Sequence, residues 1–272
     1  MHFSKFWPKK AIFVVYVKRQ YMAAISNNEI KKVKALQQKK FRDETGLFIV
    51  EGEKMVEEAL KSHFKVEDLY RKNDIGDEAM KRISSLSSPS PVLAVVHKPS
   101  DIYVDDVASV ASMLSEGGLY LALDTIRDPG NLGTIVRIAD WCGIEAVFAA
   151  PETVDVFNPK VVQATMGAIF RVRMHYMDLP SLAKAVLDSG GKVYGTFLDG
   201  ENIYSRPLDT GSSSPAVIVI GNESEGISRE MSALVSDRLY IPPFPPDDPG
   251  SESLNAAVAT AVTVAEFRRR NY

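Results

Sequence analysis

From residue 119 onward, short apolar runs alternate with longer segments in which apolar residues recur at helical spacing. The apolar runs predict strands over residues 119–123, 146–149, 171–174, 193–197 and 216–220. Between them, residues 132–142 and 179–187 have the clearest helical spacing. Strands that are apolar almost throughout are buried on both faces, so this pattern predicts an α/β fold with a parallel sheet covered by helices on both sides.

The last helical segment, residues 254–268, is apolar around almost its whole circumference. A helix of this kind is normally buried, and its alanines allow another backbone to approach closely. Residues 268–270, all arginine, stand at its carboxyl end, where positive charge is favourable in the field of the helix dipole. Gly143 follows the helix predicted over residues 132–142 and supplies the left-handed residue that commonly ends a helix.

The first hundred residues contain shorter elements of the same two kinds. A basic helix is predicted over residues 27–41. Two further helices are predicted, one directly after Gly52 and one over residues 78–83. Strands are predicted over residues 47–50, 66–70 and 92–96. The chain therefore divides into an N-terminal extension, a small α/β domain, a linker and a larger α/β domain, with bounds at residues 1–24, 25–100, 101–117 and 118–272. Within the linker, residues 107–114 have the spacing of a short helical connector.

Composition places the 272-residue chain among soluble globular proteins, because 45% of its residues are apolar and 25% are charged. The single cysteine, Cys142, excludes an internal disulfide and a cysteine-based zinc site, and its apolar neighbours predict a buried structural thiol. The four histidines are scattered singly, so a histidine-rich metal site is not expected. We expect no metal ion in this protein.

The net charge of −3 conceals an uneven distribution. Up to Arg42 the chain has eleven Lys and Arg residues and one acid, Glu29, so the remainder is strongly acidic. A basic segment on an acidic body is typical of an electrostatic handle for nucleic acid. A solvated helix face with a basic tail has the same composition, so the sequence leaves both interpretations open.

Residues 11–17 form an apolar run behind two lysines, as in the core of a signal peptide. The run is short, Lys18 and Arg19 follow it at once, and no small-residue cleavage pattern comes after it. We therefore do not expect a signal peptide. No segment reaches the length of a membrane span, and we expect a cytoplasmic protein.

Three short motifs in the second half contain most of the candidate chemistry. Residues 131–137 (NLGTIVR) come after the strand at 119–123, residues 221–226 (GNESEG) come after the strand at 216–220, and residues 253–256 (SLNA) open the last helix. Each motif combines small residues, which let a ligand approach the backbone, with polar side chains. Loops and helix starts at the edge of such a sheet are the usual place for a ligand, so the three motifs are predicted to form one site.

Local structure explains some of these residues better than others. Asn131 is well placed to cap the helix that starts there, and Ser253 is a good cap candidate for the last helix, with Asn255 within its first turn. Arg137 is harder to explain, because a cation near the start of a helix is unfavourable by roughly several tenths of a kcal/mol. A turn at residues 221–226 would account for the glycines of the second motif but does not require a carboxylate at Glu223. Arg137 and Glu223 are therefore candidates for a role in chemistry.

Taken in order, the three motifs resemble the signature motifs of the SpoU-type (TrmH-like) RNA ribose 2′-O-methyltransferases, within the SPOUT superfamily. The resemblance covers residues 119–270. It implies S-adenosylmethionine-dependent methylation of a ribose 2′-hydroxyl in structured RNA, with ribosomal RNA as the expected substrate and no metal. It also implies a deep trefoil knot in the C-terminal domain and a homodimer with its sites near the subunit interface, and composition and periodicity predict neither.

Residues 25–100 resemble, through fewer and shorter motifs, the ribosomal-protein-like domain that binds substrate RNA in many of these enzymes. The resemblance begins near Ile25. Residues before Met22 are therefore interpreted as an upstream extension, and whether they belong to the natural protein stays open.

Carried over position by position, the resemblance implies catalytic roles for five residues of the three motifs: Asn131, Arg137, Glu223, Ser253 and Asn255. It implies contacts with the cofactor for Thr196, Gly221, Ile241 and Leu254. The family's matching arginine contacts RNA and is implicated in activating the ribose hydroxyl. Because an arginine is effectively always protonated, we expect Arg137 to hold a phosphate and stabilise the developing alkoxide, with Glu223 or a water accepting the proton.

The third motif departs from the family's pattern in one respect. The loop between Ile241-Pro242 and Ser253 is longer than usual and contains Pro245, Pro246 and Pro249. We expect the cofactor pocket to survive this change, whereas the loop's own contacts and its role toward substrate are in doubt.

Three alternative functions remain open at this point. A tRNA 2′-O-methyltransferase would have the same motifs. A non-catalytic relative that binds ribosomal RNA would have no chemical reason to keep all five polar residues, and an unrelated α/β nucleotide enzyme would need a P-loop or a dinucleotide fingerprint that the sequence lacks. Binding of S-adenosylmethionine in a thermal-shift screen would eliminate the unrelated enzyme.

Overall fold

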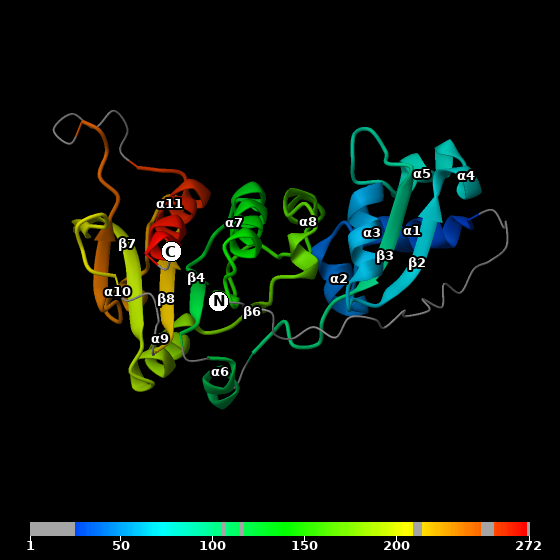
Figure 1. The fold of residues 1–272 in the computed structure, drawn as a ribbon. Helices are drawn as coiled ribbons and strands as arrows, with labels where there is room; N and C mark the ends of the chain where they lie inside the picture. The colour runs from blue at the N-terminus through cyan, green and yellow to red at the C-terminus, as the bar shows by residue number, and fades with distance from the viewer. Residues whose placement is uncertain (1–24, 105–106, 115–116, 209–213, 246–252, 271–272) are drawn as a thin grey trace, which may run out of the picture.

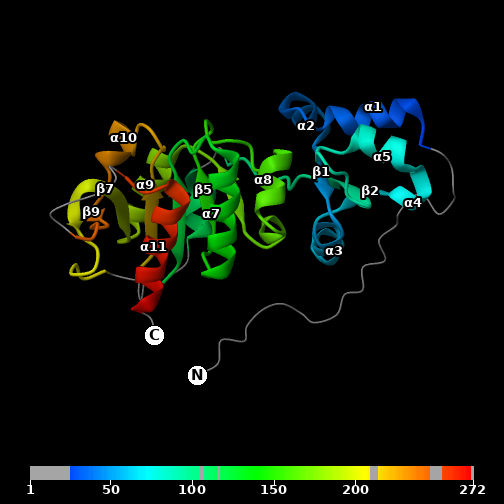
Figure 2. The same ribbon diagram turned by 90° about the horizontal axis from the view of Figure 1, so that it is seen from above.

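The computed structural model of the protein describes residues 25–104, 107–114, 117–208, 214–245 and 253–270. The extension predicted over residues 1–24 and most of the proline-rich loop lie outside the described residues. The described chain forms two α/β units side by side, with helix α8 (Pro159–Ala164) between the larger sheet and the smaller unit (Figure 1, Figure 2).

The N-terminal unit is a three-stranded antiparallel sheet with helices on both faces. Its strands, in the order β1-β3-β2, are β1 (Leu47–Glu51), β2 (Val66–Arg71) and β3 (Val92–His97). Its helices are α1 (Asn27–Ala35), α2 (Lys39–Thr45), α3 (Glu53–Lys61), α4 (Lys72–Ile75) and α5 (Asp77–Ile83). Successive strand residues face opposite ways, so Ile49 packs with α1 and α5, while Phe48 and Val50 pack toward α3 and the larger unit.

The helix predicted over residues 27–41 is two helices, α1 and α2, interrupted at residues 36–38. The backbone is extended at Gln38, with φ −99° and ψ 136°, so the helix ends before it and restarts after it. The carbonyl oxygens of Leu36 and Gln37 accept hydrogen bonds from Nη1 of Arg42, at 2.9 Å each. This side chain thus satisfies carbonyls that the break leaves without helical partners.

The C-terminal unit contains a six-stranded sheet in which every pairing is parallel. In the order β6-β5-β4-β8-β7-β9, it is built from β4 (Leu119–Leu123), β5 (Val147–Ala149), β6 (Met174–Tyr176), β7 (Lys192–Asn202), β8 (Ala216–Ile220) and β9 (Asp237–Tyr240). From β4 the chain builds outward to β6, then crosses to the other side for β7 and inserts β8 between β7 and β4. The carboxyl ends of β4 and β8 are therefore neighbours where the strand order reverses, which is where open α/β sheets bind ligands.

Helices cover both faces of this sheet (Figure 2). One face packs against α7 (Pro129–Trp141), α8, the short helix η1 (Ala168–Phe170) and α11 (Ala256–Arg269). The other packs against α6 (Val107–Met113), α9 (Leu179–Asp188) and α10 (Arg229–Ser232). Within β4, Leu121 faces the first group of helices and Tyr120 the second. The predicted α/β fold with a parallel sheet buried on both faces is confirmed.

The sequence predictions are less accurate at the two edges of this sheet. A strand is predicted at residues 171–174, but β6 begins only at Met174, and the side chains of Arg171 and Arg173 before it pair with Asp140 and Glu145. Strand β9 is not predicted at all. Only alternate residues of β9 are buried and it lies at the edge of the sheet, so no apolar run marks it in the sequence.

The residues predicted as a linker are partly bound to the larger sheet. Tyr103 forms a bridge with Tyr176 of β6, and backbone hydrogen bonds join Ile102 and Val104 to Tyr176 at 2.7 and 3.0 Å. Helix α6 follows where a helical connector is predicted. The domain bounds at residues 100 and 118 stay a prediction. Among the described residues, no helix is both long and apolar enough to span a membrane.

Candidate active site

Helix α7 begins directly after the loop that follows β4. Asp128 caps the helix, because its Oδ1 accepts a hydrogen bond from the backbone nitrogen of Asn131 at 2.8 Å, and Pro129 occupies the first helical position. The prediction that Asn131 caps this helix is therefore wrong. Since Asp128 takes that role, the side-chain amide of Asn131 is available to other partners.

The side-chain amide of Asn131 joins the three sequence motifs. Its Nδ2 donates to Oε1 of Glu223 at 2.8 Å, and its Oδ1 accepts from Nδ2 of Asn255, also at 2.8 Å. Asn131 is 9% exposed, whereas Glu223 and Asn255 lie at the surface. The structure thus brings together one residue from each motif at the carboxyl edge of the sheet.

The last helix starts later than predicted. Asn255 is its N-cap, because its Oδ1 accepts from the backbone nitrogens of Ala257 and Val258 at 3.0 and 3.3 Å. The prediction that Ser253 caps this helix, with Asn255 inside it, is therefore wrong. Ser253 is exposed and stands two positions ahead of the cap. Asn255 thus has two functions, since one side-chain group caps α11 while the other binds Asn131.

The loops after β4 and β8 are bound to each other. Nδ2 of Asn222 donates to the carbonyl of Thr125 at 2.7 Å, and Oδ2 of Asp124 accepts from the backbone nitrogen of Ser228 at 2.7 Å. Thr125 has a φ of 64°, which is unusual for a residue with a branched side chain and is often found at functional sites. The sequence predictions missed Asp124 and Thr125, although a polar residue directly after an apolar strand is a signal that could have found Asp124.

Arg137 does not join these hydrogen bonds. It lies in the third turn of α7, six positions after Asn131, which is about 9 Å along the helix axis. The expectation that it stands in the unfavourable field at the helix start is therefore wrong. Its side chain is exposed, and within the described part of the chain it has no ion-pair or hydrogen-bond partner. Trp141 follows one turn later on the same face and is 91% exposed.

Three of the residues that the resemblance assigns to the cofactor lie in, or directly after, three adjacent strands. Thr196 is in β7, Gly221 follows β8 directly and Ile241 follows β9 directly. Leu254 is 49% exposed and precedes Asn255, which is bound to Asn131 at the same edge. All four positions are therefore on the side of the sheet where the three motifs meet.

Gly221 is required by its own loop. A Cβ at this position would lie 2.3 Å from the carbonyl carbon of Gly226 and 2.4 Å from the backbone nitrogen of Ile227. Any side chain would therefore displace this backbone, whether or not a ligand is bound. A substitution at Gly221 tests the loop as much as the cofactor.

Helices α7 and α11 run side by side and are tied at both ends (Figure 2). At their starts Asn255 binds Asn131, and at their ends Nε of Arg268 donates to the carbonyl of Cys142 at 2.7 Å. Arg268 thus stabilises the carboxyl end of α7 as well as its own helix. Gly143, with a φ of 62°, ends α7 as predicted. Cys142 is half-buried, less than predicted, and this burial raises the pKa of its thiol.

The described residues contain no cluster of His, Cys, Asp and Glu side chains that could hold a metal ion. At the sheet edge, the side chains of Asn131, Asn255 and Glu223 form a cluster of two amides and a carboxylate, with the apolar side chain of Leu254 next to it in sequence. Fold and site together define an α/β enzyme that binds an organic ligand where its strand order reverses.

Comparisons with known proteins identify the family within this class. Residues 118–265 match the model of the SpoU rRNA Methylase family, and residues 27–97 match the MRM3-like substrate binding domain. The chain belongs to the SpoU rRNA methylase family, and S-adenosylmethionine is its methyl donor. The resemblance found in the sequence is thereby confirmed, and the protein is an RNA methyltransferase.

The chain is similar to relatives along nearly its whole length. It is 31% identical over 257 residues to the 23S rRNA (guanosine(2553)-2′-O)-methyltransferase RlmP of Bacillus subtilis (strain 168), covering 89% of this chain and 96% of that protein. A putative RNA methyltransferase of the TrmH family from Porphyromonas gingivalis aligns with a TM-score of 0.78 and 36% identity, covering 91% and 100%. An AdoMet-bound rRNA methyltransferase from Sinorhizobium meliloti aligns with a TM-score of 0.79 and 29% identity, covering 92% and 97%.

Proposed function

We propose that this enzyme transfers the methyl group of S-adenosylmethionine to a ribose 2′-hydroxyl of ribosomal RNA. The observation that carries the proposal is the hydrogen-bonded chain Glu223–Asn131–Asn255, which joins three distant motifs at one edge of the sheet. Relatives named for methylation of ribosomal RNA support the substrate class, and the RlmP protein is named for 2′-O-methylation. The tRNA alternative is not favoured, because the relatives whose names mention tRNA mention rRNA with it.

The residues at the sheet edge fit the cofactor. Thr196 lies within β7, Gly221 and Ile241 directly follow its two neighbours β8 and β9, and Leu254 is an exposed apolar residue that precedes Asn255 of the polar cluster. A ligand with polar and apolar parts matches such a surface. We propose that these four residues hold S-adenosylmethionine, which supplies an electrophilic methyl group when it is bound.

A ribose hydroxyl is a weak nucleophile, so the protein must orient it and ease the loss of its proton. Glu223 is suited to accept this proton. Its Oε1 is held by the amide of Asn131, while the partner of Oε2 among the described residues is the backbone nitrogen of Arg127, at 3.5 Å. Asn255 fixes Asn131 in turn, so the carboxylate is kept in one orientation. Glu223, directly or through a water, takes the proton of the 2′-hydroxyl.

Arg137 acts on the substrate side of the site, and the chain works as a homodimer. Arg137 shares a face of α7 with Trp141. Beside α7, Val258 of α11 is 48% exposed, and Leu254, which precedes that helix, is 49% exposed. Exposed apolar surface of this kind is typical of a protein interface. A second copy seated there would bring Arg137 to the interface, where its guanidinium can hold an RNA phosphate and stabilise a developing alkoxide.

The two units have different functions. Residues 25–100 bind the RNA, as the match to a substrate-binding domain supports, and residues 118–272 perform the transfer. The family resemblance also supports a deep trefoil knot in the second unit. Ser253 remains a catalytic candidate on that resemblance alone, because it lies outside the hydrogen-bonded chain.

Methylation mapping tests the proposed function. Ribosomal RNA from cells that lack this protein would be incubated with it and labelled S-adenosylmethionine, and the modified nucleotide located by mass spectrometry. We expect one 2′-O-methylated nucleotide, and no transfer when that nucleotide is replaced by its 2′-deoxy form. Methylation of a base, methylation of tRNA alone, or tight RNA binding without any transfer would overturn the proposal.

A further inference from the structure

Arg42 is the largest fully buried side chain among the described residues. It belongs to α2 of the N-terminal unit, but its partner Asp155 belongs to the loop after β5 in the larger unit. Nε and Nη2 of Arg42 donate to Oδ2 of Asp155 at 2.9 and 2.7 Å, while Nη1 donates to the carbonyls of Leu36 and Gln37. A buried guanidinium with one carboxylate and two carbonyl partners is fixed in a single position.

The loop that contains Asp155 is bound to the segment that leads from β4 into α7. The backbone nitrogen of Val154 donates to the carbonyl of Ile126 at 2.9 Å. The hydroxyl of Thr153 donates to the carbonyl of Leu123, the last residue of β4, at 3.2 Å. One short loop therefore connects Arg42 to the start of the helix that carries the site.

This loop is held firmly on its other side. The hydroxyl of Tyr176 accepts from the backbone nitrogen of Val156 at 2.8 Å and donates to the carbonyl of Val154 at 2.7 Å. Burial raises the pKa of Tyr176 well above its ordinary value, so the hydroxyl keeps the proton that it donates. Oδ1 of Asp155 accepts from the backbone nitrogen of Phe157 at 3.0 Å, so both carboxylate oxygens are occupied.

A second contact joins the N-terminal unit to the far end of α7. Arg171 donates to Asp140, near the end of α7, over 2.8 to 3.1 Å, and also to Glu58 of α3. The rings of Phe64 and Phe170 pack edge to face beside it, with centroids 5.2 Å apart. Helix α7 is therefore connected to the RNA-binding unit near both of its ends.

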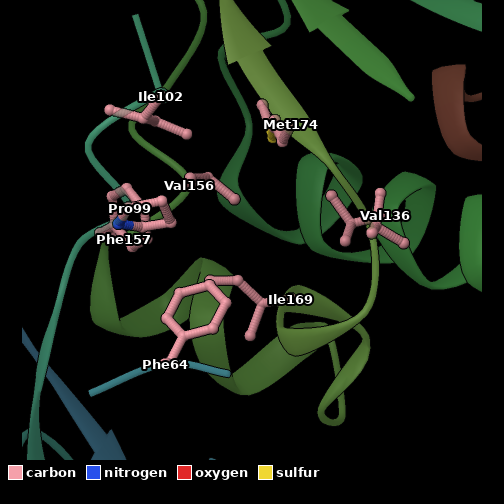
Figure 3. Close-up of a pocket in the computed structure, with 9 residues that line it drawn as sticks. Phe64, Pro99, Ile102, Val136, Val156, Phe157, Ile169 and Met174 are labelled. Atoms are coloured by element: carbon pink, nitrogen blue, oxygen red, sulfur yellow. The ribbon is translucent and has the colours of Figure 1, made fainter. Parts of the chain in front are cut away.

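The two units are packed against each other and leave little space between them. Figure 3 shows the apolar cavity at their interface, which measures about 30 Å³. The cavity is lined by Phe64, Pro99, Ile102, Val136, Val156, Phe157, Ile169, Val172 and Met174. The RNA-binding unit thus packs against the larger unit in one defined position.

We propose that Arg42 is a positioning residue of the methyltransferase, which acts through Asp155 and touches neither RNA nor cofactor. It fixes the RNA-binding unit relative to the sheet edge, and it fixes the loop that precedes Asn131. This inference rests on the proposed function, because RNA held by one unit must deliver one ribose to the other. A misplacement of about 1 Å can cost roughly a hundredfold in rate.

Two mild substitutions in the full-length chain test this inference. Arg42→Lys keeps the charge but cannot span Asp155 and two carbonyls, and Asp155→Asn weakens the same contact from the other side. In both variants we expect kcat/KM for ribosomal RNA to fall about tenfold or more, with affinity for S-adenosylmethionine within about twofold of the parent. The matched control is Arg173→Lys, whose exposed pair with Glu145 is remote from the loop, and it should stay near parent activity.

Hydrogen exchange provides a reading that does not depend on methyl transfer. In Arg42→Lys, residues 125–131 and 153–158 should exchange faster, while α11 keeps its protection. Combining the two substitutions should lower kcat/KM little more than either substitution alone, because both break one contact.

Unchanged kcat/KM or unchanged exchange would overturn the inference, as would faster exchange throughout the large sheet with loss of cofactor binding. If Arg42→Lys does not fold, kcat/KM and hydrogen exchange are compared between Asp155→Asn and the parent. A parent that transfers no methyl group would refute the proposed function and leave the exchange result standing.

Discussion

The Arg42–Asp155 pair at the domain interface and the Glu223–Asn131–Asn255 chain at the sheet edge both join segments that are far apart in the sequence. The side chains of the pair are 2% and 5% exposed, and both oxygens of Asp155 have partners. At the sheet edge, Glu223 and Asn255 lie at the surface, and Glu223 keeps an oxygen that can accept a further hydrogen bond. The first cluster is closed and the second is open.

This difference separates a structural role from a chemical one. A closed, buried cluster excludes ligands, and removing one partner leaves an uncompensated charge in the interior. An open cluster at the surface loses little stability when it is changed, but it is where substrate can bind. Substitutions in the closed cluster should therefore lower stability as well as activity, whereas substitutions in the open cluster should lower activity with little change in stability.

The largest effect on stability is expected for Arg42→Met, which leaves Asp155 buried without its partner. The free energy of unfolding should fall by about 3–5 kcal/mol in urea denaturation monitored by circular dichroism. Arg173→Met is the control, because Arg173 and Glu145 are 55% and 48% exposed, and it should cost about 1 kcal/mol or less. Equal losses in the two variants would contradict the assignment of Arg42–Asp155 as a closed cluster.

A large loss of activity with little loss of stability is expected for Glu223→Gln. Glutamine keeps an oxygen for the amide of Asn131 but loses the carboxylate that we propose as the proton acceptor. Turnover should fall on the order of a hundredfold or more, as is typical for loss of a general base. The free energy of unfolding should change by about 0.5 kcal/mol at most, because the site is at the surface. A variant with parent turnover would show that another group takes the proton.

A smaller and mixed effect is expected for Asn255→Ala. Loss of the N-cap should cost about 1 kcal/mol of stability, and release of Asn131 should lower turnover as well. Asn158, which caps α8 through the backbone nitrogen of Lys160 at 2.9 Å, offers a matched control. Asn158→Ala should lose a similar amount of stability in thermal unfolding and keep its methyl-transfer rate. If both variants keep that rate, Asn255 is only a helix cap.

The smallest effect should come from the basic residues of the N-terminal unit. Lys31, Lys32 and Lys34 are exposed and have no carboxylate partner among the described residues, whereas Lys39 and Lys40 pair with carboxylates one turn away. If α1 binds RNA electrostatically, the logarithm of the binding constant should fall linearly with the logarithm of the salt concentration. Replacing its three lysines with Gln should make this slope shallower by about 0.7 to 0.9 for each phosphate that is no longer neutralised. Replacing Lys39 and Lys40 should change that slope less. Equal slopes in all variants would favour a solvated helix face.

Much of the fold could be predicted from the sequence because its central strands are buried on both faces. The bounds of β4 and β8 match their apolar runs, since each residue of these strands is buried. Strand β9 could not be found this way, because an edge strand with one exposed face has no continuous apolar run. The break between α1 and α2 could not be predicted either, because the apolar spacing continues across it and the contacts of Arg42 with the carbonyls there are not visible in the sequence.

The meeting of the three motifs could be predicted from the sequence, whereas the contacts between them could not. Motif spacing indicated Asn131, Glu223 and Asn255, but the hydrogen bonds that join them span 92 and 124 positions. The role of Arg42 had no signal in the sequence, because Asp155 is 113 positions away. Arg137 was selected partly on a helix-dipole argument that the structure removes, so its assignment now depends on the family resemblance and on its exposed position.

Single-turnover transfer of a labelled methyl group tests most directly whether this edge of the sheet methylates RNA. The parent and Arg137→Ala would be compared on the same ribosomal RNA, with cofactor affinity measured in parallel by calorimetry. We expect the parent to transfer one methyl group per RNA, and Arg137→Ala to bind S-adenosylmethionine equally well but react on the order of a hundredfold more slowly. A parent that binds both ligands without transfer would contradict the proposed activity. A variant that reacts at the parent rate, or that fails only because it no longer binds the cofactor, would contradict the role of Arg137.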